Sequence, residues 1–363
     1  MAQPIQTRLR LTFTDAENDA TESLLPDLLS FSYSDKENME ADELDISLKD
    51  PDGDWAARFR SVSGEVVRAY IIQGSIENPG PELYCGAFYV DSMSVSGAPR
   101  VFSLKATSIP LDKPLRRKIK TRAWQKKTLG DILIQIADEN DLFPYLDAMD
   151  GPVLDRQEQN RESDLGFLAR LCEENGYSIK VTDRNIVVFD QASYEAKDPV
   201  KVFTIGESPI LSWSFDSAQS ETYKSVKLSY RDIRTKKAQK ASKYDLGYDP
   251  RAKKGGKSPV IVEYTYTDPD AGEQGQEFEW KKRAENKADA ERLAKAKLRE
   301  LNRRSVTGSM SVVGDVSLVA GEVIEVRNAG SFDGKFIIEE ASHSVDGGGY
   351  VTSLKLRRVN NNY

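Results

Sequence analysis

Runs of alternating apolar and polar residues occupy both ends of the chain, and this pattern limits the ends to β structure. Segments 8–13 (RLRLTF) and 44–48 (LDISL) alternate near the N-terminus, and segment 350–359 (YVTSLKLRRV) does so near the C-terminus. A period of two places the apolar side chains on one face of a strand. The pattern therefore predicts a β region at each end and leaves the middle to other structure.

Three internal segments have helical spacing instead. Thr128, with Asp131 three residues later, is a candidate N-cap for a helix over 128–140. Ser163 is the candidate N-cap for a helix over 163–175. A stretch rich in Ala, Lys, Glu and Leu from 284 to 304 predicts the longest helix, because these residues have high helix propensity.

The length of 363 residues suggests two or three domains, since one domain commonly holds roughly 100 to 200 residues. The patterns predict an α+β, β-rich chain. The expected divisions are a β domain over 1–112, a mixed α/β domain over 113–199, a β region over 200–283 and a long helix with C-terminal strands over 284–363.

A Lys-rich stretch interrupts the third of these regions. Residues 231–257 hold 10 Lys and Arg against 3 Asp and have no apolar periodicity, which is typical of a loop or of an insertion in a hairpin. Clustered cations can bind nucleic acid because they release its counterions, so one hypothesis is that this stretch contacts DNA. The whole chain carries a net charge of −7 and residues 1–60 hold 14 acidic against 6 basic residues, which favours a protein-facing loop.

Residues that usually carry chemistry are few. His343 is the only histidine and stands in a predicted strand away from Cys85 and Cys172, so the three form no metal-ligand spacing. We expect a structural histidine and two buried cysteines. Residues 50–54 (DPDGD) resemble a calcium loop, but the Gly stands too early and no Glu follows at the twelfth position, so a hairpin turn is expected.

Four carboxylates in the middle region are candidates for glycosidase chemistry, which needs two carboxyl groups roughly 5 to 9 Å apart. They are Glu162, Asp164, Glu173 and Glu174. On a helix over 163–175 the last two are expected on a solvated face. We therefore predict no catalytic residue, no cofactor and no metal.

Targeting signals are also missing from the sequence. The first residues lack the apolar stretch of a signal peptide, and no apolar run approaches the roughly 18 residues that a bilayer span requires. We expect a protein made in the bacterial cytoplasm, with no membrane segment.

Segment 159–177 (QNRESDLGFLARLCEENGY) closely resembles the phage late control D proteins and related contractile-tail baseplate hubs, in which an ESD-x-x-FL-x-RL helix precedes a Gly and a hairpin. Further pieces of the resemblance follow in the family's order. They are 33–35 (YSD), 41–50 (ADELDISLKD), 332–336 (FDGKF), His343 and 348–350 (GGY).

The resemblance implies a structural hub of a phage tail or a tail-like bacteriocin, with two tail-tube-like β domains flanking and joined by smaller mixed α/β regions. It implies a homotrimer that adapts a hexameric tail tube to a trimeric spike, among other baseplate proteins and the tape measure protein. The alternatives are a hub that also hydrolyses peptidoglycan, and a protein that contacts DNA through 231–257.

Overall fold

The structure is a computed structural model, and it describes most of the chain. The described residues are 7–13, 24–37, 41–59, 66–74, 79–108, 114–147, 151–182, 184–207, 209–218, 222–234, 258–268 and 275–359. Within them no helix could span a bilayer.

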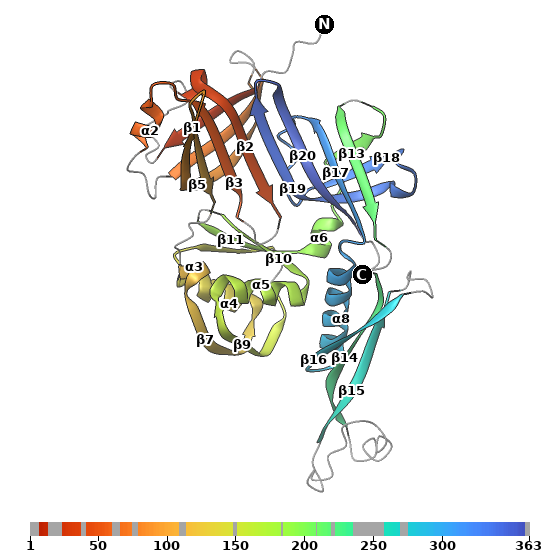
Figure 1. Cartoon of the computed structure of the whole chain (residues 1–363). Helices are drawn as coiled ribbons and strands as arrows, with labels where there is room; N and C mark the ends of the chain where they lie inside the picture. The colour runs from red at the N-terminus through yellow and green to blue at the C-terminus, as the bar shows by residue number, and fades with distance from the viewer. Residues whose placement is uncertain are drawn as a thin grey trace.

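One twelve-stranded sheet runs through both ends of the chain (Figure 1). Its N-terminal lobe consists of β1 (Thr7–Phe13), β2 (Leu28–Lys36), β3 (Glu43–Lys49), β4 (Val66–Gly74), β5 (Pro79–Ser96) and β6 (Val101–Thr107). Its C-terminal lobe consists of β12 (Lys201–Thr204), β13 (Ile210–Ser217), β17 (Val306–Val313), β18 (Val323–Arg327), β19 (Gly334–Asp346) and β20 (Gly349–Arg358).

The two lobes join edge to edge. The strand order is β1-β4-β5-β6-β3-β2-β19-β20-β17-β13, with β18 also paired to β19 and β12 to β18. The joint is the antiparallel pair β2–β19, in register from Lys36 opposite Glu340 to Ser30 opposite Asp346. The β-rich α+β class is thus confirmed, and the β regions from the two ends of the chain share one hydrogen-bonded sheet.

Each lobe keeps its own apolar core, built from alternate strand positions. Phe31, Ile46 and Leu104 are buried in the N-terminal core. Met310 and Leu354 are buried in the C-terminal core. This is the result that period-two alternation predicts, because one face of each strand turns inward.

The mixed region lies below the N-terminal lobe in Figure 1. It holds helices α3 (Pro114–Arg117), α4 (Leu129–Asp138) and α5 (Asp164–Asn175), the ribbon β7 (Ile119–Thr128) with β9 (Val153–Ser163), and the sheet β10 (Tyr177–Val181), β11 (Asn185–Asp190) and β8 (Phe143–Leu146). Both predicted caps are confirmed: Thr128 and Asp131 form a capping box, and Ser163 Oγ accepts from the Gly166 N–H.

The sheets divide the second half of the chain differently from the expected regions 200–283 and 284–363. Strands β14 (Tyr223–Arg234), β15 (Ser258–Thr267) and β16 (Gln276–Ala284) form a separate sheet that packs on α8 (Lys287–Asn302). The expected region 200–283 therefore does not form one unit: β12 and β13 pair with the C-terminal strands, whereas β14, β15 and β16 pack with α8. Apolar residues of α8 such as Leu298 have their partners in β14, not in the C-terminal core.

Most of the predicted basic loop lies outside the described residues. Residues 231–234 end β14, and β14 and β15 pair antiparallel up to Arg234 opposite Ser258. β14 and β15 therefore form the two strands of a hairpin, and the loop expected at 235–257 lies outside the described residues.

The expected hairpin turn at 50–54 is wrong. β3 pairs with β2 and β6, not with the next strand along the chain. Gly53 has φ +84° and precedes the short helix α2 (Asp54–Arg58), while the Asp50 carboxylate accepts from the Trp55 N–H at 2.9 Å. Asp50 and Gly53 are thus used to start a helix, and the sequence signal for a turn could not tell the two outcomes apart.

Gly308 in β17 has no room for a side chain. A Cβ there would stand 2.4 Å from Phe215 Cδ1 and 3.1 Å from the Ser214 carbonyl oxygen. Replacing Gly308 by alanine should displace Phe215 from Phe336 and lower the free energy of unfolding by about 1–3 kcal/mol. Gly347→Ala is the control, because a Cβ at position 347 would have no atom within 4 Å. If the two substitutions lowered the free energy of unfolding equally in denaturant unfolding, this packing would be refuted.

Candidate functional site

One face of the large sheet is lined with serine side chains from both lobes. They form two rows of register partners that cross neighbouring strands. The first row is Ser94, Ser103, Ser47 and Ser30, and the second is Ser34, Ser342, Ser353, Ser311 and Ser212. Hydroxyl pairs within this face lie 2.9–3.2 Å apart: Ser34 with Ser342, Ser311 with Ser353, Ser214 with Ser309, and Ser47 with Ser103.

Charged side chains on this serine face form ion pairs with one another. Lys36 pairs with Glu43 at 3.0 Å, Lys105 with Asp45 at 3.3 Å, and Lys355 with Glu340 at 2.6 Å. The cores of protein interfaces are enriched in aromatic residues and depleted of charge, whereas this face carries small hydroxyls and neutralised charges. Its composition suits contact with water.

A buried ion cluster joins the two lobes to the helices. Arg357 of β20 is 2% exposed and contacts three carboxylates: Glu195 of α6 (Gln191–Glu195) at 2.5 Å, Glu37 at 3.2 Å and Glu339 at 3.4 Å. Burial alone would lower the pKa of Arg357, but the surrounding carboxylates raise it above its ordinary value. Arg303, just after α8, also contacts Glu37 and Glu339.

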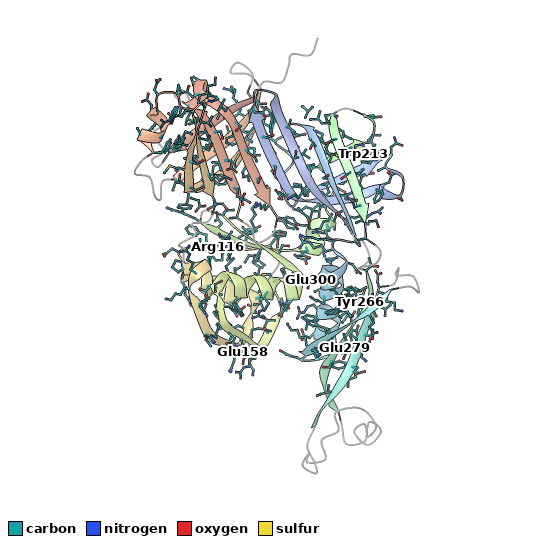
Figure 2. The ribbon with its side chains drawn as sticks, viewed as in Figure 1. Arg116, Glu158, Trp213, Tyr266, Glu279 and Glu300 are labelled. Atoms are coloured by element: carbon teal, nitrogen blue, oxygen red, sulfur yellow. The ribbon has the colours of Figure 1, made fainter. Side chains whose placement is uncertain are left out.

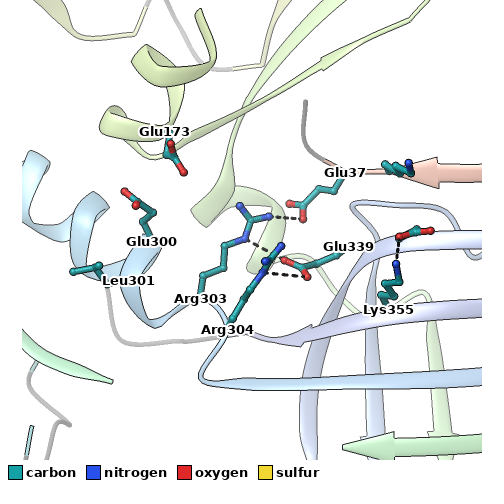
Figure 3. A pocket seen from close by; sticks show the side chains of 10 residues that line it. Glu37, Glu173, Glu300, Leu301, Arg303, Arg304, Glu339 and Lys355 are labelled. Carbon is teal, nitrogen blue, oxygen red and sulfur yellow. Dashed lines mark hydrogen bonds and ion pairs between the residues drawn. The ribbon is translucent and has the colours of Figure 1, made fainter. Parts of the chain in front are cut away.

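Beside this cluster lies a pocket of about 510 Å³ with a strongly charged lining (Figure 3). Four separate segments contribute to it: the end of β2, α5, the end of α8 and the C-terminal sheet. Glu173 and Glu300 lie on the same side of it in Figure 3. Burial raises the pKa of Glu300, and the charges of Glu173 and Glu174 add to this.

The mixed region has its own buried anion, Asp164, which is 1% exposed at the start of α5. Lys120 and Arg122 of β7 donate to its two carboxylate oxygens at 2.6 and 2.8 Å. Gln159 and Asn140 add hydrogen bonds at 2.9 and 3.3 Å. Asp164 thus ties the β7–β9 ribbon to the helices.

Glu139 joins the same network. Burial would raise the pKa of this carboxyl, but hydrogen bonds from Lys120 and Arg122 lower it to about 2. The network therefore places two carboxylates against two cations.

The structure separates the four carboxylates considered for glycoside hydrolysis into different contacts. Asp164 is in the network above, and Glu162 pairs with Arg170 at 2.7 Å. Glu174 contacts Arg170 at 3.6 Å and also Lys282 of β16. Only Glu173 lines the charged pocket. Three of the four thus make ion pairs that hold α5 to its neighbours.

His343 lies in the middle of the sheet and is fully buried. Its Nδ1 lies 2.8 Å from the Tyr350 hydroxyl and 3.3 Å from Thr352 Oγ1, and its ring stacks on Tyr33 with centroids 5.8 Å apart. Both cysteines are buried, as expected, and burial raises the pKa of each thiol. Within the described ranges no three His, Cys, Asp or Glu side chains cluster as metal ligands would.

The burial of His343 predicts a pH dependence of stability. Burial lowers its pKa from 6.5 to about 4, so between these values the unfolded chain binds a proton that the folded chain does not. Stability from this group is complete above pH 6.5 and is lost as the pH falls towards 4, by about 3 kcal/mol. Asp42 acts oppositely, because its pKa is raised from 3.8 to about 6.

His343→Gln separates the two effects, because the variant keeps Asp42. Denaturant unfolding from pH 7 to 4 should show the wild type losing stability relative to the variant. A constant difference between them across this range would contradict the assignment.

A second joint, which the sequence alone does not predict, connects the N-terminal lobe to the mixed region. Lys180 of β10 contacts the buried carboxylate of Asp35 and lies 3.4 Å from Asp42 Oδ2. The Ala320 N–H, from the C-terminal lobe, donates to Asp35 Oδ2 at 2.9 Å. Burial raises the pKa of Asp42, with Asp35 adding to the shift and Lys180 opposing it. Both carboxylates fall in the segments that carry the family resemblance, which was the one available signal.

Comparison with known proteins shows which family the sequence matches. The sequence profile of the family described as "Phage tail baseplate hub (GPD)" matches residues 40–349. The "Probable baseplate hub protein" of Escherichia phage P2 is 28% identical, covering 93% of this chain and 90% of its own. The protein of the same description from Escherichia phage 186 is 26% identical over the same shares.

Solved structures share the fold. The tail protein from Neisseria meningitidis MC58 matches with a TM-score of 0.66 at 14% identity, covering 97% of both chains. The 43 kDa tail protein of prophage MuSo2 from Shewanella oneidensis matches with a TM-score of 0.63 at 11% identity, covering 98% of both chains. Since the family profile spans most of its length, this chain belongs to the phage tail baseplate hub family.

Proposed function

We propose that three copies of this baseplate hub protein form a ring that adapts a hexameric tail tube to a trimeric spike. Each chain contributes two β lobes, so a ring of three presents six β units, which suits a sixfold partner. The observation that carries the proposal is the β2–β19 joint, because it fixes both lobes in one continuous sheet. Other baseplate proteins and the tape measure protein are the further partners of this ring.

The serine face is proposed to line the central passage of the ring. Small hydroxyls leave the passage wide, and the ion pairs Lys105–Asp45 and Lys355–Glu340 compensate the charge of two lysines on it. A wall of this kind would let a tape measure protein or DNA pass without strong attachment, because tight binding of a polyanion requires unpaired cations.

The role is proposed to be structural and not catalytic. The ion pairs of Asp164, Glu162 and Glu174 support this, since they join α5 to β7, β9 and β16 respectively. The protein would be made in the bacterial cytoplasm and built into the tail or tail-like particle. Release of fragments from peptidoglycan by the purified protein would instead favour a hub that also hydrolyses the cell wall.

Light scattering on the purified full-length protein tests the ring. The expected mass is three times that of one chain, at concentrations in the micromolar range. A protein that stays monomeric at all concentrations, alone and with its spike, would refute the adaptor role.

A further inference from the structure

Rows of apolar residues that cross the C-terminal lobe are buried until they reach its last strand. One such row passes through Ala341, Leu354 and Met310, which are 0%, 2% and 1% exposed. Its next member is Trp213 of β13, which is 49% exposed. Figure 2 shows Trp213 at the outer side of this lobe. The apolar layer therefore continues to the edge of the sheet and is uncovered there.

The N-terminal lobe has the same feature at its opposite side. A row passes through Phe31, Ile46 and Leu104, which are 0%, 2% and 2% exposed, and ends at Met93 in the second half of β5, which is 39% exposed. Val95, the next residue on that face, is 50% exposed.

Both outer strands also have an open hydrogen-bonding edge. Among the described residues β13 pairs only with β17, and β5 beyond Tyr89 pairs only with β6. Exposed edges are usually protected by Lys, Pro or a bulge that turns the strand away. Each strand has a register shift just before the open segment, between Val90 and Ser92 in β5 and between Ile210 and Ser212 in β13. The segments beyond these shifts, 92–96 (SMSVS) and 212–215 (SWSF), pair in regular register with their inner neighbours and carry neither charge nor proline.

The two edges match each other in chemistry. Each alternates serines on the polar face with large apolar side chains on the other, and each stands at the end of a serine row. The chain already joins two such edges internally, at β2–β19, where Ser34 and Ser342 hydroxyls lie 2.9 Å apart. In Figure 1 β5 and β13 lie on opposite sides of the two-lobed sheet, so they cannot meet within one molecule.

We propose that β13 of one copy pairs with residues 92–96 of β5 in the next copy. The occupant of each open edge is thus a second copy of this chain, and the inference rests on the proposed ring. Such a contact uses two different surfaces, and contacts of this type close into rings when the rotation between copies allows it. Pairing would continue both the serine rows and the apolar rows, and would cover Trp213 and Met93. A groove of about 570 Å³ beside β13, lined by Leu211, Trp213 and Val313, adds apolar area to the contact.

Charge placed on either edge tests this pairing. Trp213→Lys and Met93→Lys should each raise the dissociation constant of the trimer at least tenfold in sedimentation or light scattering. Val153→Lys is the matched control, because Val153 is 67% exposed on the distant β7–β9 ribbon, and it should leave the trimer unchanged. Thermal unfolding of each variant distinguishes dissociation from misfolding.

A cross-link gives a second readout that needs no destabilising change. Ser94→Cys combined with Ser212→Cys, treated with a short bismaleimide, should give covalent dimers and trimers, while either single change should not. Cys85 and Cys172 are buried and contribute little background. A trimeric wild type whose lysine variants stay trimeric and whose cysteine pair fails to cross-link would overturn the strand pairing alone. A monomeric wild type would overturn the ring as well.

Discussion

Replacing Arg357 by methionine is expected to lower the free energy of unfolding by about 3–5 kcal/mol. Arg357 is the central cation of the buried cluster, and its loss leaves Glu37, Glu195 and Glu339 close together in a site from which water is largely excluded. Methionine fills much of the same volume, so the effect would report lost charge compensation and not a cavity. Calorimetry of the full-length protein measures it.

Lys355→Met is the control, two positions earlier on the same strand. Lys355 is 69% exposed and pairs with Glu340, so its replacement should cost less than about 1 kcal/mol. If the Arg357 and Lys355 variants unfolded at the same temperature, the buried ion cluster around Arg357 would not contribute to the stability of the contacts between α6, α8 and the two lobes.

Replacing Asp164 by asparagine is expected to lower the stability of the mixed region by about 3 kcal/mol or more. Asparagine keeps the shape of the side chain, but it leaves Lys120 and Arg122 with one carboxylate, Glu139, in place of two in a partly buried site. Hydrogen exchange of the α4 and α5 amides should accelerate, because both helices depend on this network to hold the β7–β9 ribbon.

Glu158→Gln is the matched control within the same ribbon. Glu158 pairs with Arg156, and both side chains are about 60% exposed, so its loss should change stability by less than about 1 kcal/mol. Unchanged exchange in the Asp164 variant would show that α5 is held by its apolar contacts alone.

Local features of the fold could be predicted from the sequence because they depend on neighbouring residues. The capping box at Thr128, the N-cap at Ser163 and the alternation at 44–48 each predicted the element that forms there. The ribbon β7–β9 was missed, because Trp124 and Leu154 are among its few buried apolar residues and both of its faces are largely polar. A strand without apolar alternation leaves no periodic signal.

The joints between parts of the chain could not be predicted for a different reason. The pairing of β2 with β19 brings together residues about 300 positions apart, and backbone hydrogen bonds carry no residue preference that would reveal the partner. Arg357 lies in the segment LKLRR, whose alternating charges are typical of the exposed end of a strand. Its burial depends on Glu37 and Glu195, which are far from it in sequence and contact it only in the folded chain. The family resemblance marked Asp35, Asp164 and His343 as positions of interest, but only the fold gives them their structural contacts.

A cryo-electron microscopy map of the purified oligomer tests most directly whether the serine face lines the passage of a three-copy ring. We expect a threefold ring with Ser103 and Ser311 facing an open, water-filled centre, and with β13 beside β5 of the next copy. A map in which this face is covered by another chain, or points to the outside of the assembly, would contradict it.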